Sequence, residues 1–494
     1  MCSGDPAPLL TEGQCPMLSR MTMTWDALLS PTRQVNLARG DRIARADPLF
    51  NEFDQDHGRA VFSSPIRRLQ DKAQVFPMDP TDAIRTRLTH SMEVSSVARG
   101  LARRIAVKEL GEGRLRPESV RDLETVVATS ALLHDLGNPP FGHAGEGAMR
   151  DWFRRQFADH GVGAGLPDAY RRDFELFEGN AQSIRLVSRL QLLVRDDGLN
   201  LTCATLGALQ KYVVAANDVD GTSHSKKKPG FFQSEANLVQ EVREELGMAP
   251  AARNPLALMM EAADDICYSV VDLEDGTKKG AVQWPHVLEA FRRSEQQDPG
   301  RIGLGLCEKA MEQVDAQKPA DMPSDATEQA YMQMFRVMFI GRAVKAAANA
   351  FEANRDAIMA GDFLGELNDA GDCFPAVKVC KGLGRSHVYR EASILRLELR
   401  GRRVISDLLD FYWMGAGTAV VGDDGVAGPG RGARQGMAER AFDLISENYV
   451  RVFRRAVKEE PELIDYHRLQ LIADQVCGMT DSYACGLHAD LCGG

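Results

Sequence analysis

The chain of 494 residues lacks several signatures that would place it in other protein classes. It contains 10 cysteines but no CxxC pair, so neither a zinc ribbon nor a thioredoxin-like site is expected, and we interpret the thiols as free in a reducing compartment. No apolar run reaches the roughly 18 residues of a membrane-spanning helix. Residues 1–20 lack the charged and apolar regions of a secretory signal. We therefore expect a cytoplasmic protein that does not enter a membrane.

Aromatic residues are also few, at 7%, and positive charge does not predominate. The formal net charge of -11 argues against a protein whose whole surface grips nucleic acid, although local basic clusters such as 226–228 remain. Hydrophobic residues make up 44%, enough for a core of mostly aliphatic side chains and alanine. At about 150 residues per domain, the length suggests about three domains, or one large helical body with insertions.

Apolar residues recur at helical spacing through most of the chain and strand-like alternation is rare, so the predicted fold class is all-α. A Gly-rich stretch at 414–436 predicts a surface loop. We expect an irregular N-terminal segment at 1–40, a catalytic core at 41–282 and a helical C-terminal region at 283–494 that completes the core. The predicted helical segments are 86–110, 119–136, 180–194, 201–214, 255–275, 327–354 and 437–481.

Two histidines and two aspartates on three predicted helices are the strongest candidate for a metal site. They are His90 near the start of one helix, His134 and Asp135 at the end of the next, and Asp264 midway along the third. Mixed imidazole and carboxylate ligands suit Mn, Fe or Mg, and helical bundles build such sites from facing helices. A lone His-Asp pair is weak evidence, because most buried histidines are core residues. The Gly-Asn-Pro-Pro break that follows Leu136 favours a site, since it opens a concavity.

His143 and Glu146 follow that break and share a face if a helix begins there. A carboxylate that orients an imidazole is a standard acid–base unit. The alternative is a surface histidine beside a glutamate that the helix dipole stabilises. From these two residues alone, the alternative is favoured.

A third pattern lies on the helix predicted at 255–275. Asp264, Tyr268 and Asp272 fall at i, i+4 and i+8 and therefore line one stripe. The stripe offers a metal ligand, a ring to pack on a sugar, and a carboxylate to accept a hydroxyl. The alternative is a solvated acidic face, which apolar neighbours such as Ile266 and Val270 make less attractive.

Together these stretches resemble the bacterial deoxyguanosine triphosphate triphosphohydrolases of the HD superfamily. The resemblance runs in order over nearly the whole chain and is far more specific than any single motif. It rests on residues 67–70, 74–77, 85–93, 134–143 (HDLGNPPFGH), 177–182, 227–230, 261–268 and 478–481.

The resemblance assigns roles to individual residues. It implies that His90, His134, Asp135 and Asp264 bind the metal, and that His143 and Glu146 form the catalytic pair. It implies substrate contacts by Gln74, Arg87, Asn180, Lys211, Tyr212, Lys228, Tyr268 and Asp272. An insertion at 195–198 and the Val213 that follows Tyr212 depart from the family pattern, which puts Lys211 and Tyr212 in doubt. A family arginine near the C-terminus cannot be placed, and Arg451 and Arg454 are candidates.

The resemblance also implies an activity, a cofactor and partners. The expected reaction is hydrolysis of dGTP, or of other dNTPs, to the deoxynucleoside and intact triphosphate, with one Mg²⁺ or Mn²⁺ per subunit. The expected fold is an HD-type helical bundle, and the expected assembly is a homo-oligomer such as a hexamer. The resemblance also allows single-stranded DNA as a modulator. The alternatives are another HD phosphohydrolase (a nucleotidase or phosphodiesterase), a nucleotide-sensing nucleic-acid-binding protein, and a helical scaffold with a dead site. A missing ligand would indicate the last, and none of the four is missing.

Overall fold

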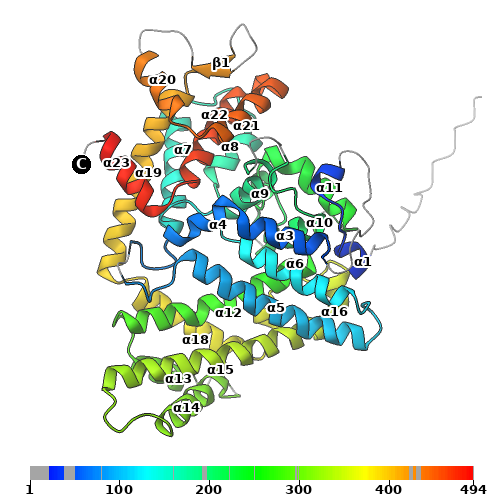
Figure 1. Cartoon of the computed structure of the whole chain (residues 1–494), viewed down its shortest axis with the longest axis vertical. Coiled ribbons are helices and arrows are strands. Elements are labelled where there is room, and N and C mark those ends of the chain that lie inside the picture. The colour runs from blue at the N-terminus through cyan, green and yellow to red at the C-terminus, as the bar shows by residue number, and fades with distance from the viewer. Residues whose placement is uncertain are drawn as a thin grey trace, which may run out of the picture.

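A computed structural model describes most of the chain, and Figure 1 shows an elongated helical molecule with α14 at one end and β1 and α20 at the other. The described residues are 22–37, 50–78, 81–159, 161–191, 197–221, 223–249, 251–294, 298, 300–421, 427–429 and 435–492. Helices dominate throughout, which confirms the predicted all-α class. Two short antiparallel strands, β1 (Ala419–Val421) and β2 (Ala427–Pro429), pair with Ala419 opposite Pro429.

Three helices form the centre of the fold: α5 (Arg87–Gly111), α6 (Ser119–Leu133) and α12 (Pro255–Lys278). Two of these helices begin at a residue whose side chain caps the first turn. The Thr86 side chain accepts the Thr89 amide at the start of α5, and Asn254 caps α12, which has proline at its first position. Most residues of α12 are buried, because it packs against α5, α6 and the long α15 (Ser324–Ala353).

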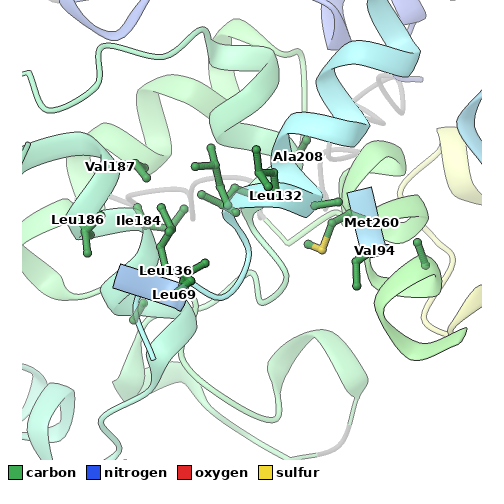
Figure 2. Close-up of a cluster of buried hydrophobic side chains, with 14 of the residues drawn as sticks. Leu69, Val94, Leu132, Leu136, Ile184, Leu186, Val187, Ala208 and Met260 are labelled. Atoms are coloured by element: carbon green, nitrogen blue, oxygen red, sulfur yellow. The ribbon is translucent and has the colours of Figure 1, made fainter. Parts of the chain in front are cut away.

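Apolar side chains from distant parts of the chain fill the space beside these helices. Figure 2 shows Val94 of α5, Leu132 of α6 and Met260 of α12 gathering there with Leu69 and Leu136. All five are at most 5% exposed, so this part of the core is closed to solvent. Removing such side chains from water is the main force that assembles helices whose own stability is marginal.

A second group of helices lies toward the end of the molecule that carries β1 and α20 (Figure 1). Of these, α19 (Ala392–Ala416) packs along α7 (Gly142–Asp159) and against α22 (Ile464–Cys477) and α23 (Asp481–Cys492). The remaining helices are α1 (Trp25–Leu28), α2 (Gln34–Leu37), α3 (Glu52–Phe62), α4 (Ser64–Arg68), α8 (Asp168–Glu175), α9 (Gly179–Arg189), α10 (Cys203–Leu209), α11 (Ala236–Glu245), α13 (Trp284–Arg293), α14 (Ile302–Asp315), α16 (Arg355–Met359), α17 (Leu367–Ala370), α18 (Phe374–Leu383), α20 (Gln435–Asp443) and α21 (Glu447–Glu459). Short 3-10 turns lie at Leu69–Asp71, Ala216–Asp218, His224–Lys226, Gln233–Glu235 and Pro461–Leu463, and a π-helical turn at Gly384–Val388.

The structure corrects three of the predicted elements. The helix predicted at 201–214 ends at Leu209, because Val213 N donates to Ser225 O and Gly230 N to Val214 O, which binds this backbone to residues 225 and 230 in place of a further helical turn. The loop predicted at 414–436 contains the end of α19 and both strands. The irregular segment predicted at 1–40 contains α1 and α2, while residues 1–21 and 38–40 lie outside the described part.

Other expectations stand as follows. The helix predicted at 180–194 is α9, with residues 192–194 outside the described part, and the region predicted at 437–481 divides into several helices. The division into 1–40, 41–282 and 283–494 stays a prediction. Among the helices that the structure describes, none is both long and apolar enough to span a membrane.

Candidate active site

A cavity of about 380 Å³ opens where the start of α5, the end of α6, the starts of α7 and α9 and the middle of α12 meet. Thirteen of the fourteen residues predicted from the sequence line it: Gln74, Arg87, His90, His134, Asp135, His143, Asn180, Lys211, Tyr212, Lys228, Asp264, Tyr268 and Asp272. Glu146 is the exception, since it lies buried behind His143. A larger hollow of about 600 Å³ between α5 and α15 contains none of the predicted residues. The smaller cavity is therefore the candidate active site.

His90, His134 and Asp264 converge at the floor of the cavity. One ligand atom from each lies within 4.8 Å of the others. Asp264 Oδ1 is 3.3 Å from His90 Nε2 and 3.5 Å from His134 Nε2. Two imidazole nitrogens and a carboxylate oxygen facing one point form a donor set that fits a divalent transition metal or Mg²⁺.

The surroundings of His134 prepare it as a ligand. Its Nδ1 lies 2.7 Å from the carbonyl oxygen of Ala131, a contact that fixes the ring and turns Nε2 towards Asp264. Burial alone would lower the pKa of His134, but the carboxylates of Asp135 and Asp264 raise it to about 9. The same attraction, together with the Lys211 ammonium, holds the pKa of Asp264 well below its usual range against the opposing effect of burial. This site therefore stabilises positive charge.

Asp135, the fourth predicted ligand, borders the same space. Its Oδ1 is 3.6 Å from His134 Nε2, but both of its oxygens also accept hydrogen bonds. Arg87 Nη1 donates to Oδ2 at 2.7 Å and Asn138 Nδ2 donates to Oδ1 at 2.5 Å. The pKa of Asp135 is depressed, since the charges of Arg87 and His134 outweigh its burial, so the carboxylate is anionic.

His143 and Glu146 lie on the first turn of α7 and form the predicted pair. Glu146 Oε2 is 2.9 Å from His143 Nδ1, and its Oε1 accepts the amide of Gly179 at 2.9 Å. The Glu146 side chain is 1% exposed, whereas that of His143 is 83% exposed. Burial would raise the pKa of Glu146, but His143 and Lys228 lower it. The fixed carboxylate thus orients an accessible imidazole whose Nε2 is available for proton transfer.

Tyr268 and Asp272 lie along one wall with a partner that the sequence did not reveal. The Tyr268 ring stacks on that of Tyr389 at 6.2 Å, and the Tyr389 hydroxyl donates to Asp272 Oδ2 at 2.5 Å. Asp272 Oδ1 and Gln74 Oε1 are buried without a hydrogen-bond partner among the described residues. Buried acceptors rarely remain unpaired. Both oxygens are therefore suited to accept a hydrogen bond from a hydroxyl group of a ligand.

Cations occupy the other side of the cavity. Lys211 Nζ donates to Asp264 Oδ2 at 3.4 Å. The Asp264 carboxylate keeps the pKa of Lys211 well above its usual value, although burial alone would lower it. Lys228 Nζ and Asn180 Nδ2 both donate to Glu178 Oε1, at 3.0 and 2.9 Å. The Lys211 ammonium thus points to the cluster of His90, His134 and Asp264, and its role as a substrate contact stays a prediction.

Several lining residues were not singled out from the sequence. Glu178 lies inside the stretch 177–182 on which the family resemblance rests, so a signal existed, whereas Tyr389, Ile394 and Glu398 follow α18 and carry no recognisable motif. Arg451 and Arg454 are on α21 and are not among the described residues that line the cavity.

Comparison with known proteins agrees with this geometry. The family model of the HD domain matches residues 87–189, a range that includes His90, His134 and Asp135 but not Asp264. The chain is 35% identical over 481 residues to a deoxyguanosinetriphosphate triphosphohydrolase-like protein of Listeria innocua, an alignment that covers 95% of this chain and 100% of that protein. It is 35% identical over 486 residues to the deoxyguanosinetriphosphate triphosphohydrolase of Klebsiella pneumoniae strain 342, covering 90% of this chain and 94% of that protein.

Proposed function

Because the chain belongs to the deoxyguanosinetriphosphate triphosphohydrolase family of HD-domain hydrolases, we propose that it hydrolyses 2′-deoxynucleoside triphosphates, with dGTP preferred. The products are the deoxynucleoside and intact triphosphate. The observation that carries the proposal is the meeting of metal-type ligands, cations and unpaired hydroxyl acceptors around one cavity of about 380 Å³. These three groups match the α-phosphate, the triphosphate chain and the sugar of such a substrate.

One divalent ion per subunit, Mg²⁺ or Mn²⁺, is part of the proposal. His90, His134, Asp135 and Asp264 would hold it, and the donor set fits because Nδ1 of His134 is already fixed by Ala131. When bound, such an ion supplies a Lewis acid for a phosphoryl oxygen and lowers the pKa of a water molecule. Arg87, Lys211 and Lys228 add positive charge where the triphosphate binds.

The reaction balances with one proton leaving a water molecule and one joining the nucleoside. The water oxygen forms a bond to the α-phosphorus, and the bond from that phosphorus to the 5′-oxygen breaks. The 5′-oxygen then takes a proton. His143, whose Nδ1 is held by Glu146 at 2.9 Å, is the group placed to move a proton at its Nε2.

The wall that contains Tyr268 and Asp272 would select the sugar and the base. Asp272 and Gln74 offer acceptors for a 3′-hydroxyl, and the packed rings of Tyr268 and Tyr389 fill the space that a 2′-hydroxyl would need. The preference for guanine comes from the names of the relatives. Glu398, at the cavity wall, supports it, because its carboxylate accepts N–H donors and guanine presents them on its Watson–Crick edge.

The test is incubation of the purified chain with each of the four dNTPs and Mg²⁺ or Mn²⁺, with the products resolved by chromatography. We expect deoxyguanosine and intact triphosphate from dGTP, slower turnover of the other three, and no turnover in excess EDTA. Release of orthophosphate or a nucleoside monophosphate would instead indicate another HD phosphohydrolase. Bound metal without turnover of any dNTP would indicate a nucleotide sensor.

Assembly and modulation extend the proposal. From the family resemblance we propose a homo-oligomer, such as a hexamer, and modulation by single-stranded DNA. Light scattering of the purified chain measures the first. The proposed modulation predicts that added single-stranded DNA changes the rate of dGTP turnover, and that this effect becomes smaller as the salt concentration rises.

A further inference from the structure

Asp481, the first residue of α23, is 2% exposed and binds two separate segments of the chain that line the cavity. Its Oδ1 accepts the backbone amide of Phe141 at 2.9 Å, and its Oδ2 accepts that of Ala73 at 3.0 Å. The partners are 340 and 408 residues away in the sequence. A single buried carboxylate thus joins three distant parts of the fold.

Each of the two segments carries a group of the proposed reaction. Phe141 and Gly142 form the left-handed turn, with φ of 62° and 54°, that directs His143 into the cavity. A left-handed backbone is strained for phenylalanine, so the bond from its amide to Asp481 helps to hold it. Ala73 directly precedes Gln74, one of the proposed sugar contacts.

Lys72 crosses the same junction with opposite charge. Its buried Nζ donates to the carbonyl oxygens of Asn138 at 2.6 Å and of Cys477 at 2.8 Å. Asn138 in turn donates to the proposed ligand Asp135. The charges of Lys72 and Asp481 each offset part of the cost of burying the other. The Lys72 contacts also tie the turn after α6 to the segment between α22 and α23.

We propose that Asp481 is a positioning residue that sets the relative place of His143 and Gln74, the proton-transfer side and the sugar side of the cavity. This role accounts for the stretch 478–481, which takes no direct part in the site. The kinetic consequences rest on the proposed function, whereas the structural consequence, loss of protection at two backbone amides, does not.

The test combines hydrogen exchange with kinetics in Asp481→Ala and Asp481→Asn. Ser482→Ala is the matched control, because Ser482 Oγ donates to Asp71 Oδ1 at 2.8 Å and so joins α23 to the segment before Ala73 at an exposed position. Deuterium uptake is followed by mass spectrometry in peptides that contain Ala73 or Phe141. Metal content, kcat, and the ratio of kcat/KM for dGTP and GTP are measured on the same samples.

We expect both peptides of Asp481→Ala to exchange faster while peptides from α12 and α15 stay protected. With metal retained, kcat should fall by about 10²-fold, since a displacement near 1 Å has that effect. The dGTP-to-GTP ratio should also fall, which a purely structural role would not cause. Asp481→Asn keeps one acceptor oxygen, so it should leave one of the two peptides protected. Ser482→Ala should match the wild type.

Wild-type exchange at both peptides in Asp481→Ala would overturn the inference. So would uniformly faster exchange over the whole chain in both Asp481 variants, because it would show general destabilisation only. If the wild-type chain cleaves no dNTP while the two peptides respond as expected, the proposed substrate is wrong and the positioning role of Asp481 stands.

Discussion

At the scale of single residues, the proposed proton-transfer pair, His143 and Glu146, lies apart from the proposed metal ligands. His143 contacts Glu146 through Nδ1, and its position at the start of α7 is distinct from the cluster of His90, His134 and Asp264. Glu146 owes its fixed position to the Gly179 amide and to burial. Proton transfer and metal affinity should therefore respond to different substitutions.

We predict that His143→Ala keeps the bound metal and lowers the kcat for dGTP by about 10²- to 10⁴-fold, the usual contribution of a positioned acid–base group. Asp264→Ala should lose both metal and turnover. Metal content by mass spectrometry and product analysis distinguish the two. His286→Ala, on the exposed face of α13, serves as the control and should retain both. Full activity in His143→Ala would refute the catalytic assignment.

Asp173 of α8 gives a prediction about pH. Burial raises its pKa to about 7, although Gln233 N and the Tyr466 hydroxyl donate to it. The unfolded value is about 3.9, so between these two values only the folded state holds the proton. The contribution of Asp173 to the free energy of unfolding therefore falls as pH rises from about 4 to about 7 and remains lost above that.

Asp173→Asn removes this titration. The free energy of unfolding of the variant relative to the wild type should rise with pH across that window, by up to about 1.4 kcal/mol per pH unit. Thermal unfolding from pH 4.5 to 8 measures it. Asp168→Asn, an exposed position on the same helix, should show no such trend. A flat difference for Asp173→Asn would show that its pKa is not raised.

At the scale of elements, the junction of α6 with α9 depends on Gly137. Its amide donates to Ser183 Oγ at 2.9 Å, and a methyl group there would collide with Gly179 O and Ser183 N. The turn after α6 approaches α9 this closely only because Gly137 has no side chain. The same approach places Gly179 where its amide binds Glu146.

Gly137→Ala should therefore lower the free energy of unfolding by about 1–3 kcal/mol, the usual effect of overpacking. Turnover of dGTP should fall as well, because the shift reaches Glu146. Gly100→Ala in α5 is the control, since no atom lies within 4 Å of the added methyl group. That variant should be unchanged or more stable by up to about 1 kcal/mol. Equal stability of both variants would contradict the close approach.

The elements that the sequence predicted well are those with local signals. Thr86 and Asn254 mark the starts of α5 and α12 through their own caps, and apolar periodicity marks the lengths. The end of α10 could not be predicted, because the path of 210–215 depends on bonds to residues 225 and 230. The position of Tyr389 beside Asp272 is likewise fixed by contact across 117 residues.

At the scale of the molecule, Arg185 joins α9 to α22. Its guanidinium donates to Asp474 at 2.8 and 2.9 Å and to Glu235 at 3.1 Å, and all three residues are buried. A buried ion pair contributes little net stability, but removing one partner leaves an uncompensated charge. The C-terminal helices are thus bound to the matched HD region by an interaction that tolerates little change.

Asp474→Ala should lower the free energy of unfolding by about 3–5 kcal/mol, because Arg185 would lose its main partner. Asp465→Ala, on the same helix but in a partly exposed pair with Arg468, should cost at most about 1 kcal/mol. Thermal unfolding of both variants at neutral pH gives the comparison. Similar losses would show that the buried pair does not hold α22 in place.

The bond between Asp481 and Phe141 also has a consequence for biosynthesis. Phe141 leaves the ribosome 340 residues before the carboxylate that holds it, at a rate of about 5–20 residues per second. Once residue 272 has been made, the growing polypeptide contains all the histidines and aspartates of the site but still lacks the bond to Asp481. Under the proposed positioning role of Asp481, we expect full activity only after α23 has been made and has docked.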